Sequence, residues 1–125
     1  MKRLKKSNDF PTTLKAGYRH YKLDICKNGD ELNPRYAGRT DSKARLITID
    51  GSASVGEGAE TLLHELFHVA WSNGGLSEVV DRSNEEKIIN ILSIQIATMI
   101  HDNPDLFKWI IKNETHFWTC LFRSN

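Results

Sequence analysis

The stretch 61–70 constrains this chain more than any other part of its sequence. It carries His64, Glu65 and His68 in the pattern His-Glu-x-x-His, within a run that is typical of helix. Side chains four positions apart on a helix are separated by about 40° of rotation and about 6 Å of rise. The two imidazoles therefore point the same way from successive turns, which suits two ligands of one Zn²⁺. Glu65 falls beside such an ion, where it can take a proton from a bound water.

The residues that flank this motif are uncharged and mostly apolar. They are Leu62, Leu63, Leu66, Phe67, Val69 and Ala70. A helix that is apolar on both sides of its polar row is typical of burial between two layers. Two histidines and a glutamate are costly there unless something satisfies them, which favours a metal site. The alternative is an amphipathic helix whose polar stripe faces water.

The whole chain has the length and composition of one ordinary globular domain. It has 125 residues and a formal net charge of +1, so charge gives no case for specific nucleic-acid binding. We expect a basic, flexible tail over residues 1–16 and a single domain over residues 17–125. The basic start lacks the apolar run of a signal peptide. We therefore expect a cytoplasmic protein in which Cys26 and Cys120 are reduced thiols, with no membrane association. The two cysteines also lack the spacing of a metal site.

The first half of the chain predicts a small sheet. Residues 17–26 alternate with period two, residues 44–50 are rich in β-formers, and residues 35–38 can add a short strand. Residues 27–34 and 39–42 have the chemistry of turns, with Asn28-Gly29 as a reversal, and residues 51–58 that of a loop. We expect two to four mostly antiparallel strands.

The second half predicts three helices. The motif helix runs from about residue 57 to 73 and ends at Gly74-Gly75. A second helix, capped by Ser83 or Asn84, continues to about residue 100 and is apolar nearly all round, which predicts a buried central helix. Asn103-Pro104 starts a third helix over about 105–121, with core candidates Leu106, Trp109, Ile110, Phe117 and Leu121. The predicted fold class is α+β: the sheet packs on the motif helix and on a second, glutamate-bearing helix, with a C-terminal helix added.

A catalytic zinc site needs a third protein ligand, and the second helix offers two. Glu86 is our preferred ligand, because its helical neighbours Asn90 and Ser93 make a polar face that can meet the histidine row. Asn90 can then hydrogen-bond a ligand from outside the metal shell. Glu85 has apolar neighbours at the same spacings, so its face looks like core. The alternatives are that Glu85 is the ligand, or that both glutamates only complement the helix dipole.

These residues resemble a known family. Residues 61–70 followed by a helical glutamate resemble the zincin metallopeptidases of the gluzincin type. The segment 86–90 is similar to the Glu-x-x-Ala-Asn segment of the ImmA/IrrE-type peptidases, with Ile89 in place of Ala. The short length and the run ending in Asp102-Asn103-Pro104 resemble small HExxH proteins encoded by phages or prophages. The resemblance covers about residues 17–107 and implies a minimal zincin fold with His64, His68 and Glu86 as zinc ligands.

The function expected from these features is zinc-dependent hydrolysis of peptide bonds, with Glu65 as the catalytic base. By resemblance, the substrate is a protein in the same cytoplasm, such as a repressor or other regulatory protein; a phage-encoded chain would act in the host cytoplasm. An extended substrate can pair with strand 46–50 as an edge strand. The sequence leaves the oxyanion donor open among Tyr36, His20, Arg39, Arg82, His101 and His116. The alternative function is a non-catalytic zincin-fold module, for example a phage protein that engages a host factor.

Overall fold

The computed structural model describes residues 4, 9–26 and 37–114. These residues form an α+β fold with four strands, three α-helices and one 3₁₀ helix. The strands are β1 (Thr13–Ala16), β2 (Arg19–Cys26), β3 (Gly38–Asp41) and β4 (Leu46–Asp50); the helices are α1 (Val55–Asn73), η1 (Leu76–Glu78), α2 (Arg82–Asp102) and α3 (Pro104–Asn113). The chain divides into a first unit, residues 1–94, and a second unit, residues 95–125, with α2 continuing from one to the other.

The sheet is mixed, with strand order β1-β2-β4-β3. The outer pairs β1/β2 and β3/β4 are antiparallel, as expected, but the central pair β2/β4 is parallel. Strand β4, which we expected to lie at an edge, is therefore interior. The edges are β1 and β3, so an extended ligand would have to pair with one of these strands.

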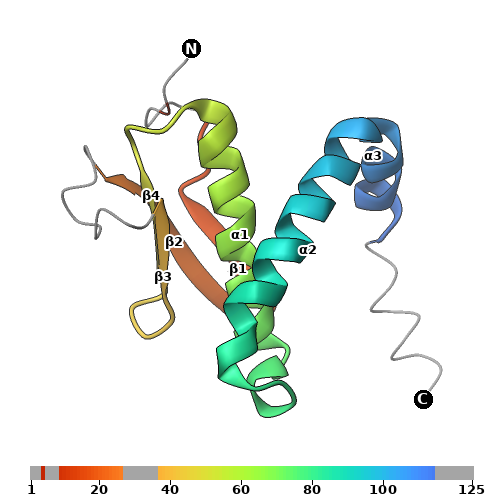
Figure 1. The fold of residues 1–125 in the computed structure, drawn as a ribbon. Helices are drawn as coiled ribbons and strands as arrows, with labels where there is room; N and C mark the ends of the chain where they lie inside the picture. The colour runs from red at the N-terminus through yellow and green to blue at the C-terminus, as the bar shows by residue number, and fades with distance from the viewer. Residues whose placement is uncertain (1–3, 5–8, 27–36, 115–125) are drawn as a thin grey trace. The chain divides into compact units, whose positions relative to one another are not determined.

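The core of the first unit lies where the central strands meet α1 (Figure 1). Leu23 of β2 is in register with Ile47 of β4, and Ile49 is buried beside them. Val69 of α1 belongs to the same cluster, so the apolar side of the motif helix faces the sheet. Helix α1 packs on β1, β3 and β4, so this helix covers the sheet and carries the motif at the interface.

Helix α1 is fixed at its start by a capping box. The Ser54 side chain accepts a hydrogen bond from the Glu57 backbone N–H, and the Glu57 carboxylate accepts one from the Ser54 backbone N–H. The helix begins at Val55, slightly before the expected start, and Gly74 ends it as expected. One turn in, a Cβ atom at Gly58 would lie 2.9 Å from a methyl of Leu4, so the glycine permits close packing of that leucine.

The N-terminal boundary and the third strand differ from expectation. Strand β1 and the buried Leu4 both lie within residues 1–16, so this segment is not simply a flexible tail. Strand β3 occupies most of the segment expected to be a turn at 39–42, because pairing with β4 outweighs the weak β-propensity of its polar residues. The expected turn at 27–34, and the first half of the expected strand at 35–38, lie outside the described residues, while Gly38 begins β3.

Helix α2 is less buried than its composition predicts. The Asp81 carboxylate caps it by accepting a hydrogen bond from the Ser83 backbone N–H, so the cap is neither Ser83 nor Asn84. Within the first unit Ile89 is fully buried, whereas Ile91 and Ile94 are 63% and 62% exposed. The prediction of a buried central helix is therefore wrong. Helix α1 already covers the sheet, and α2 buries only a narrow face.

In the second unit, α3 begins with Asn103 as cap and Pro104 in the first turn, as expected. It ends at Asn113, and the expected continuation to residue 121 lies outside the described residues. Leu106, Trp109 and Ile110 are exposed in the described structure and are not core residues; Phe117 and Leu121 are not described. Cys26 is a buried free thiol, and Cys120 is outside the description. None of the described helices has the length and apolar character needed to cross a membrane.

Candidate metal centre

The two motif histidines of α1 and a glutamate of α2 converge on one point. The Nε2 atoms of His64 and His68 lie 3.2 Å apart, and the two side chains are 19% and 20% exposed. The Glu86 carboxylate spans both rings, with Oε1 2.9 Å from His64 Nε2 and Oε2 2.9 Å from His68 Nε2. The structure thus brings together the three residues that the sequence predicts as ligands, and they form a group that could hold a metal ion.

The spacing of these atoms fits a small divalent cation. Ligands of a tetrahedral zinc ion, at bond lengths of about 2.0–2.2 Å, are about 3.3–3.6 Å apart. The separations of 2.9, 2.9 and 3.2 Å, in which each histidine faces a different oxygen of Glu86, fall below this range, so the side chains have to move outward to admit the ion. Glu86 is 61% exposed, which leaves the solvent side of the cluster open to a further ligand. Imidazole and carboxylate ligands also suit other divalent transition metals, so the donor set alone does not select zinc.

The hydrogen-bond donors of the cluster give an independent reason to place a cation there. Four close contacts meet at these rings: the Nε2–Nε2 contact, the two contacts of Glu86, and a contact between His68 Nδ1 and Glu85 Oε1 at 3.0 Å. Two neutral imidazoles carry two N–H groups between them, so they cannot supply a separate hydrogen to each of these four contacts. A cation bound by both Nε2 atoms and by Glu86 would replace three of these contacts, namely the Nε2–Nε2 contact and the two contacts of Glu86, so that none of the three needs a hydrogen. His68 Nδ1–H is then left to donate to Glu85.

Glu85 therefore has neither of the two roles considered for it, since it is not a ligand and does more than complement the helix dipole. It is not in the ligand group, yet its 24% exposed side chain contacts Nδ1 of His68, the ring nitrogen that does not face Glu86. A carboxylate that accepts the second N–H of a ligating histidine fixes the ring orientation and raises the basicity of the metal-binding nitrogen. Asn90, expected in this outer role, is exposed. Of the two apolar neighbours that made the Glu85 face look like core, Ile89 is buried but Leu92 is exposed. Because Glu85 and Glu86 are adjacent, sequence reasoning treated them as competitors, whereas in the structure each contacts a motif histidine.

Glu65 lies in the interface between α1 and the sheet and is 6% exposed. Its Oε2 accepts a hydrogen bond from the Thr40 hydroxyl at 2.5 Å. Thr40 belongs to the edge strand β3, so the sheet holds the proposed base in place. Sequence reasoning missed Thr40, because its segment was expected to be a turn and no local signal links it to a residue 25 positions later.

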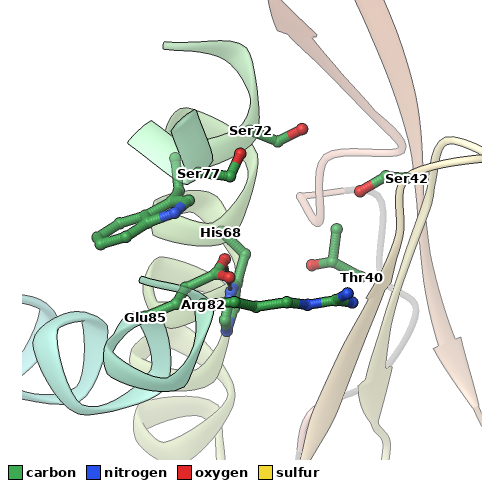
Figure 2. Close-up of a pocket in the computed structure, with 8 residues that line it drawn as sticks. Thr40, Ser42, His68, Ser72, Ser77, Arg82 and Glu85 are labelled. Atoms are coloured by element: carbon green, nitrogen blue, oxygen red, sulfur yellow. Dashed lines mark hydrogen bonds and ion pairs between the residues drawn. The ribbon is translucent and has the colours of Figure 1, made fainter. Parts of the chain in front are cut away.

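A cavity of about 410 Å³ opens beside His68 in the first unit (Figure 2). It is lined by Thr40, Ser42, His68, Trp71, Ser72, Ser77, Arg82 and Glu85. Among the expected oxyanion donors, Arg82 lines this cavity, while His20 and Arg39 are exposed residues outside its lining. His101 lies in the second unit, and Tyr36 and His116 are outside the described residues.

The turn that closes β3 onto β4 carries a perturbed carboxyl group next to the cavity. Hydrogen bonds from the backbone N–H groups of Ala44 and Lys43 to the Asp41 carboxylate hold the pKa of Asp41 below its usual value, with Ala44 the larger cause. The same turn contains Arg45 in the left-handed region, at φ 53°. The ionised Asp41 therefore stabilises the turn that follows Thr40 and includes Ser42.

Comparisons with known proteins give no relative from which a role could be transferred. No family model, no curated protein and no solved structure matches this chain. The resemblance to zincin peptidases therefore rests on the motif helix and on the glutamate helix. What these residues can do chemically has to be judged from their own geometry.

Proposed function

We propose that this protein is a zinc-dependent peptidase that hydrolyses peptide bonds of a protein or peptide substrate. The observation that carries the proposal is the convergence of His64 Nε2, His68 Nε2 and the Glu86 carboxylate, with separations of 2.9–3.2 Å. A structural zinc site is usually closed by four protein ligands. Among the described residues the ligand group has three members, which is the number typical of catalytic zinc.

Each residue of the site then has a distinct role. His64, His68 and Glu86 would hold the ion, and Glu85 would orient the His68 ring through Nδ1. A bound zinc ion would polarise the substrate carbonyl and make water acidic enough to attack near neutral pH. Glu65 would accept the proton of the attacking water and pass it to the leaving amine. Thr40, by donating to Glu65 Oε2, would hold one carboxylate oxygen and leave the other for this transfer.

The substrate would lie between the metal centre and the sheet. Strand β3 is the sheet edge that carries Thr40, so an extended peptide could pair with β3 through main-chain hydrogen bonds. This replaces the pairing with residues 46–50 expected from sequence, since β4 is interior. The cavity beside His68 would then receive a substrate side chain or terminus.

One observation favours a second candidate, a non-catalytic metal-binding module that engages a partner protein. Glu65 is buried, and its recorded hydrogen bond is to Thr40 rather than to the ligand group. If this bond is permanent, Glu65 stabilises the contact between α1 and β3 and does not transfer protons. Both candidates share the same metal centre, so metal binding alone does not separate them.

The experiment that separates them compares wild type with Glu65→Gln and Glu86→Ala. We expect wild type and Glu65→Gln to hold about one zinc per chain, and Glu86→Ala to hold far less, by elemental analysis after dialysis. Wild type should cleave an unfolded protein substrate, and Glu65→Gln should be slower by roughly 10²–10⁴-fold. Zinc-loaded protein without activity would support the non-catalytic module. Protein that binds no zinc would overturn both candidates.

A further inference from the structure

The cavity beside His68 has a composition that points to the chemistry of its ligand. Its volume of about 410 Å³ lies within the range of about 300–1,000 Å³ that is usual for small-ligand sites. Because His68 borders it, any group that fills the cavity lies next to the proposed metal ion. We propose that this cavity binds a carboxylate of the substrate and that Arg82 is the residue that recognises it. This inference rests on the proposed function and specifies its substrate class.

The charges in the cavity leave one cation without a counter-charge. The Glu85 carboxylate is engaged with His68 Nδ1, and together with Glu86 it offsets the charge of a divalent ion. Arg82 makes no hydrogen bond or ion pair within the part of the chain that the structure describes. Figure 2 shows its side chain extending across the cavity towards Thr40 on the sheet side. Arg82 is therefore a cation of the cavity lining that no ion pair within the described residues neutralises.

The other polar groups in the lining can also donate hydrogen bonds. The hydroxyls of Ser42, Ser72 and Ser77 have no hydrogen-bond partner within residues 4, 9–26 and 37–114. Trp71 is 5% exposed, and its buried Nε1–H likewise has no acceptor in the described structure. The three serines are exposed to solvent, whereas the buried indole N–H of Trp71 is costly unless a ligand or water satisfies it. A negatively charged acceptor can pair with the Arg82 guanidinium and also accept hydrogen bonds from the neutral donors of the lining.

A carboxylate meets these requirements in a peptide substrate. Its two oxygens match the paired N–H groups of a guanidinium, which lysine cannot reproduce. Two parts of a peptide supply it: the C-terminal carboxylate of the residue after the cleaved bond, or the side chain of Asp or Glu near that bond. The same recognition chemistry serves both, and synthetic peptides can distinguish them.

The first test measures binding to the full, zinc-loaded chain and does not depend on turnover. The probes are the monohydroxamate of succinic acid and its analogue with the carboxylate replaced by a carboxamide, measured by calorimetry. We expect wild type to bind the carboxylate probe about tenfold more tightly, as for a hydrogen bond to a charged group. Arg82→Gln should remove most of this preference, and Arg82→Lys should keep part of it. Lys87→Gln makes the same charge change on an exposed residue of α2 outside the cavity lining, and should keep the preference.

The second test identifies the source of the carboxylate with peptides. Faster cleavage of a free than of an amidated C-terminus, lost in Arg82→Gln, would assign the terminal carboxylate. Faster cleavage of Asp or Glu peptides than of Asn or Gln peptides, lost in the same variant, would assign a side chain. Cleavage of all peptides without an Arg82-dependent preference would overturn the inference and leave the peptidase proposal standing. Absence of any cleavage would count against the peptidase, while equal or no binding of the two probes would still overturn the carboxylate site.

Discussion

Replacing Glu85 tests whether the structure assigns the two neighbouring glutamates correctly. In Glu85→Gln the side chain keeps its shape and can still accept the hydrogen bond of His68 Nδ1, but it loses its charge. In Glu85→Ala the acceptor is lost as well, and the His68 ring is free to turn. Both variants keep His64, His68 and Glu86, so the metal should still bind, only more weakly.

The expected magnitude follows from the contact of 3.0 Å between His68 Nδ1 and Glu85 Oε1. Loss of such an outer carboxylate weakens metal binding by roughly 10–100-fold, or about 1.4–2.7 kcal/mol. Glu85→Gln should lie near the lower limit, since charge-assisted hydrogen bonds are about twice as strong as neutral ones. At a free zinc concentration of about 100 times the wild-type Kd, zinc stabilises wild type by about 2.7 kcal/mol. This gain should fall to roughly 1.4 kcal/mol after a tenfold loss of affinity and to roughly 0.4 kcal/mol after a 100-fold loss.

The assay is a competition between protein and a chromophoric zinc chelator, with thermal unfolding at fixed free zinc as the second measurement. Glu60→Gln is the matched control, because Glu60 is an exposed glutamate of α1. If Glu85→Gln and Glu85→Ala bind zinc as tightly as Glu60→Gln, Glu85 has no orienting role. If they lose zinc as completely as Glu86→Ala does, Glu85 is itself a ligand and the arrangement of the two helices has been misjudged.

Three further predictions concern the sheet contact and the packing of the motif helix. Thr40→Val removes the hydroxyl that holds Glu65, so peptide turnover should fall by about tenfold or more while zinc affinity stays unchanged in the chelator assay. Gly56→Ala should stabilise the protein by about 0.5–1 kcal/mol in urea unfolding, because a Cβ at this position meets nothing within 4 Å. Gly58→Ala should not show this gain, because its Cβ would clash with a methyl of Leu4 2.9 Å away. Equal effects of the two substitutions would refute the packing of Leu4 on Gly58. Asp41→Asn should lower the midpoint of thermal unfolding at neutral pH, and because the pKa of Asp41 is lowered in the folded protein, the difference from wild type should shrink as pH falls below about 4.

Some features of this protein follow from short-range sequence patterns. The helical positions of His64, His68 and Glu65 follow from a spacing of four residues and from apolar flanks. Gly74 as a helix end and Asn103-Pro104 as a helix start are likewise local, because caps and turns depend on a few neighbouring residues. The sequence also supplied Glu86 as a candidate ligand, since its distance along the chain fits one turn and a returning helix.

Other features depended on contacts between residues far apart in the chain. The interior position of β4 follows from its parallel pairing with β2, which no local pattern encodes. The exposure of Ile91 and Ile94 arises because α1 already covers the sheet, so an apolar α2 has little left to cover. Even strand β3 exists mainly because β4 offers it a partner.

By itself, the sequence determined the two-histidine row, its neighbouring glutamate and the α+β class, because these depend on residue type and on the period of a helix or strand. Only the tertiary structure decided that Glu85 lies behind His68 and that Thr40 holds Glu65. It alone brought Arg82 to a cavity beside the candidate metal centre. These arrangements bring together residues as far apart in the chain as Thr40 and Glu85. The free energy that holds them together comes from side-chain burial and strand pairing across the whole first unit.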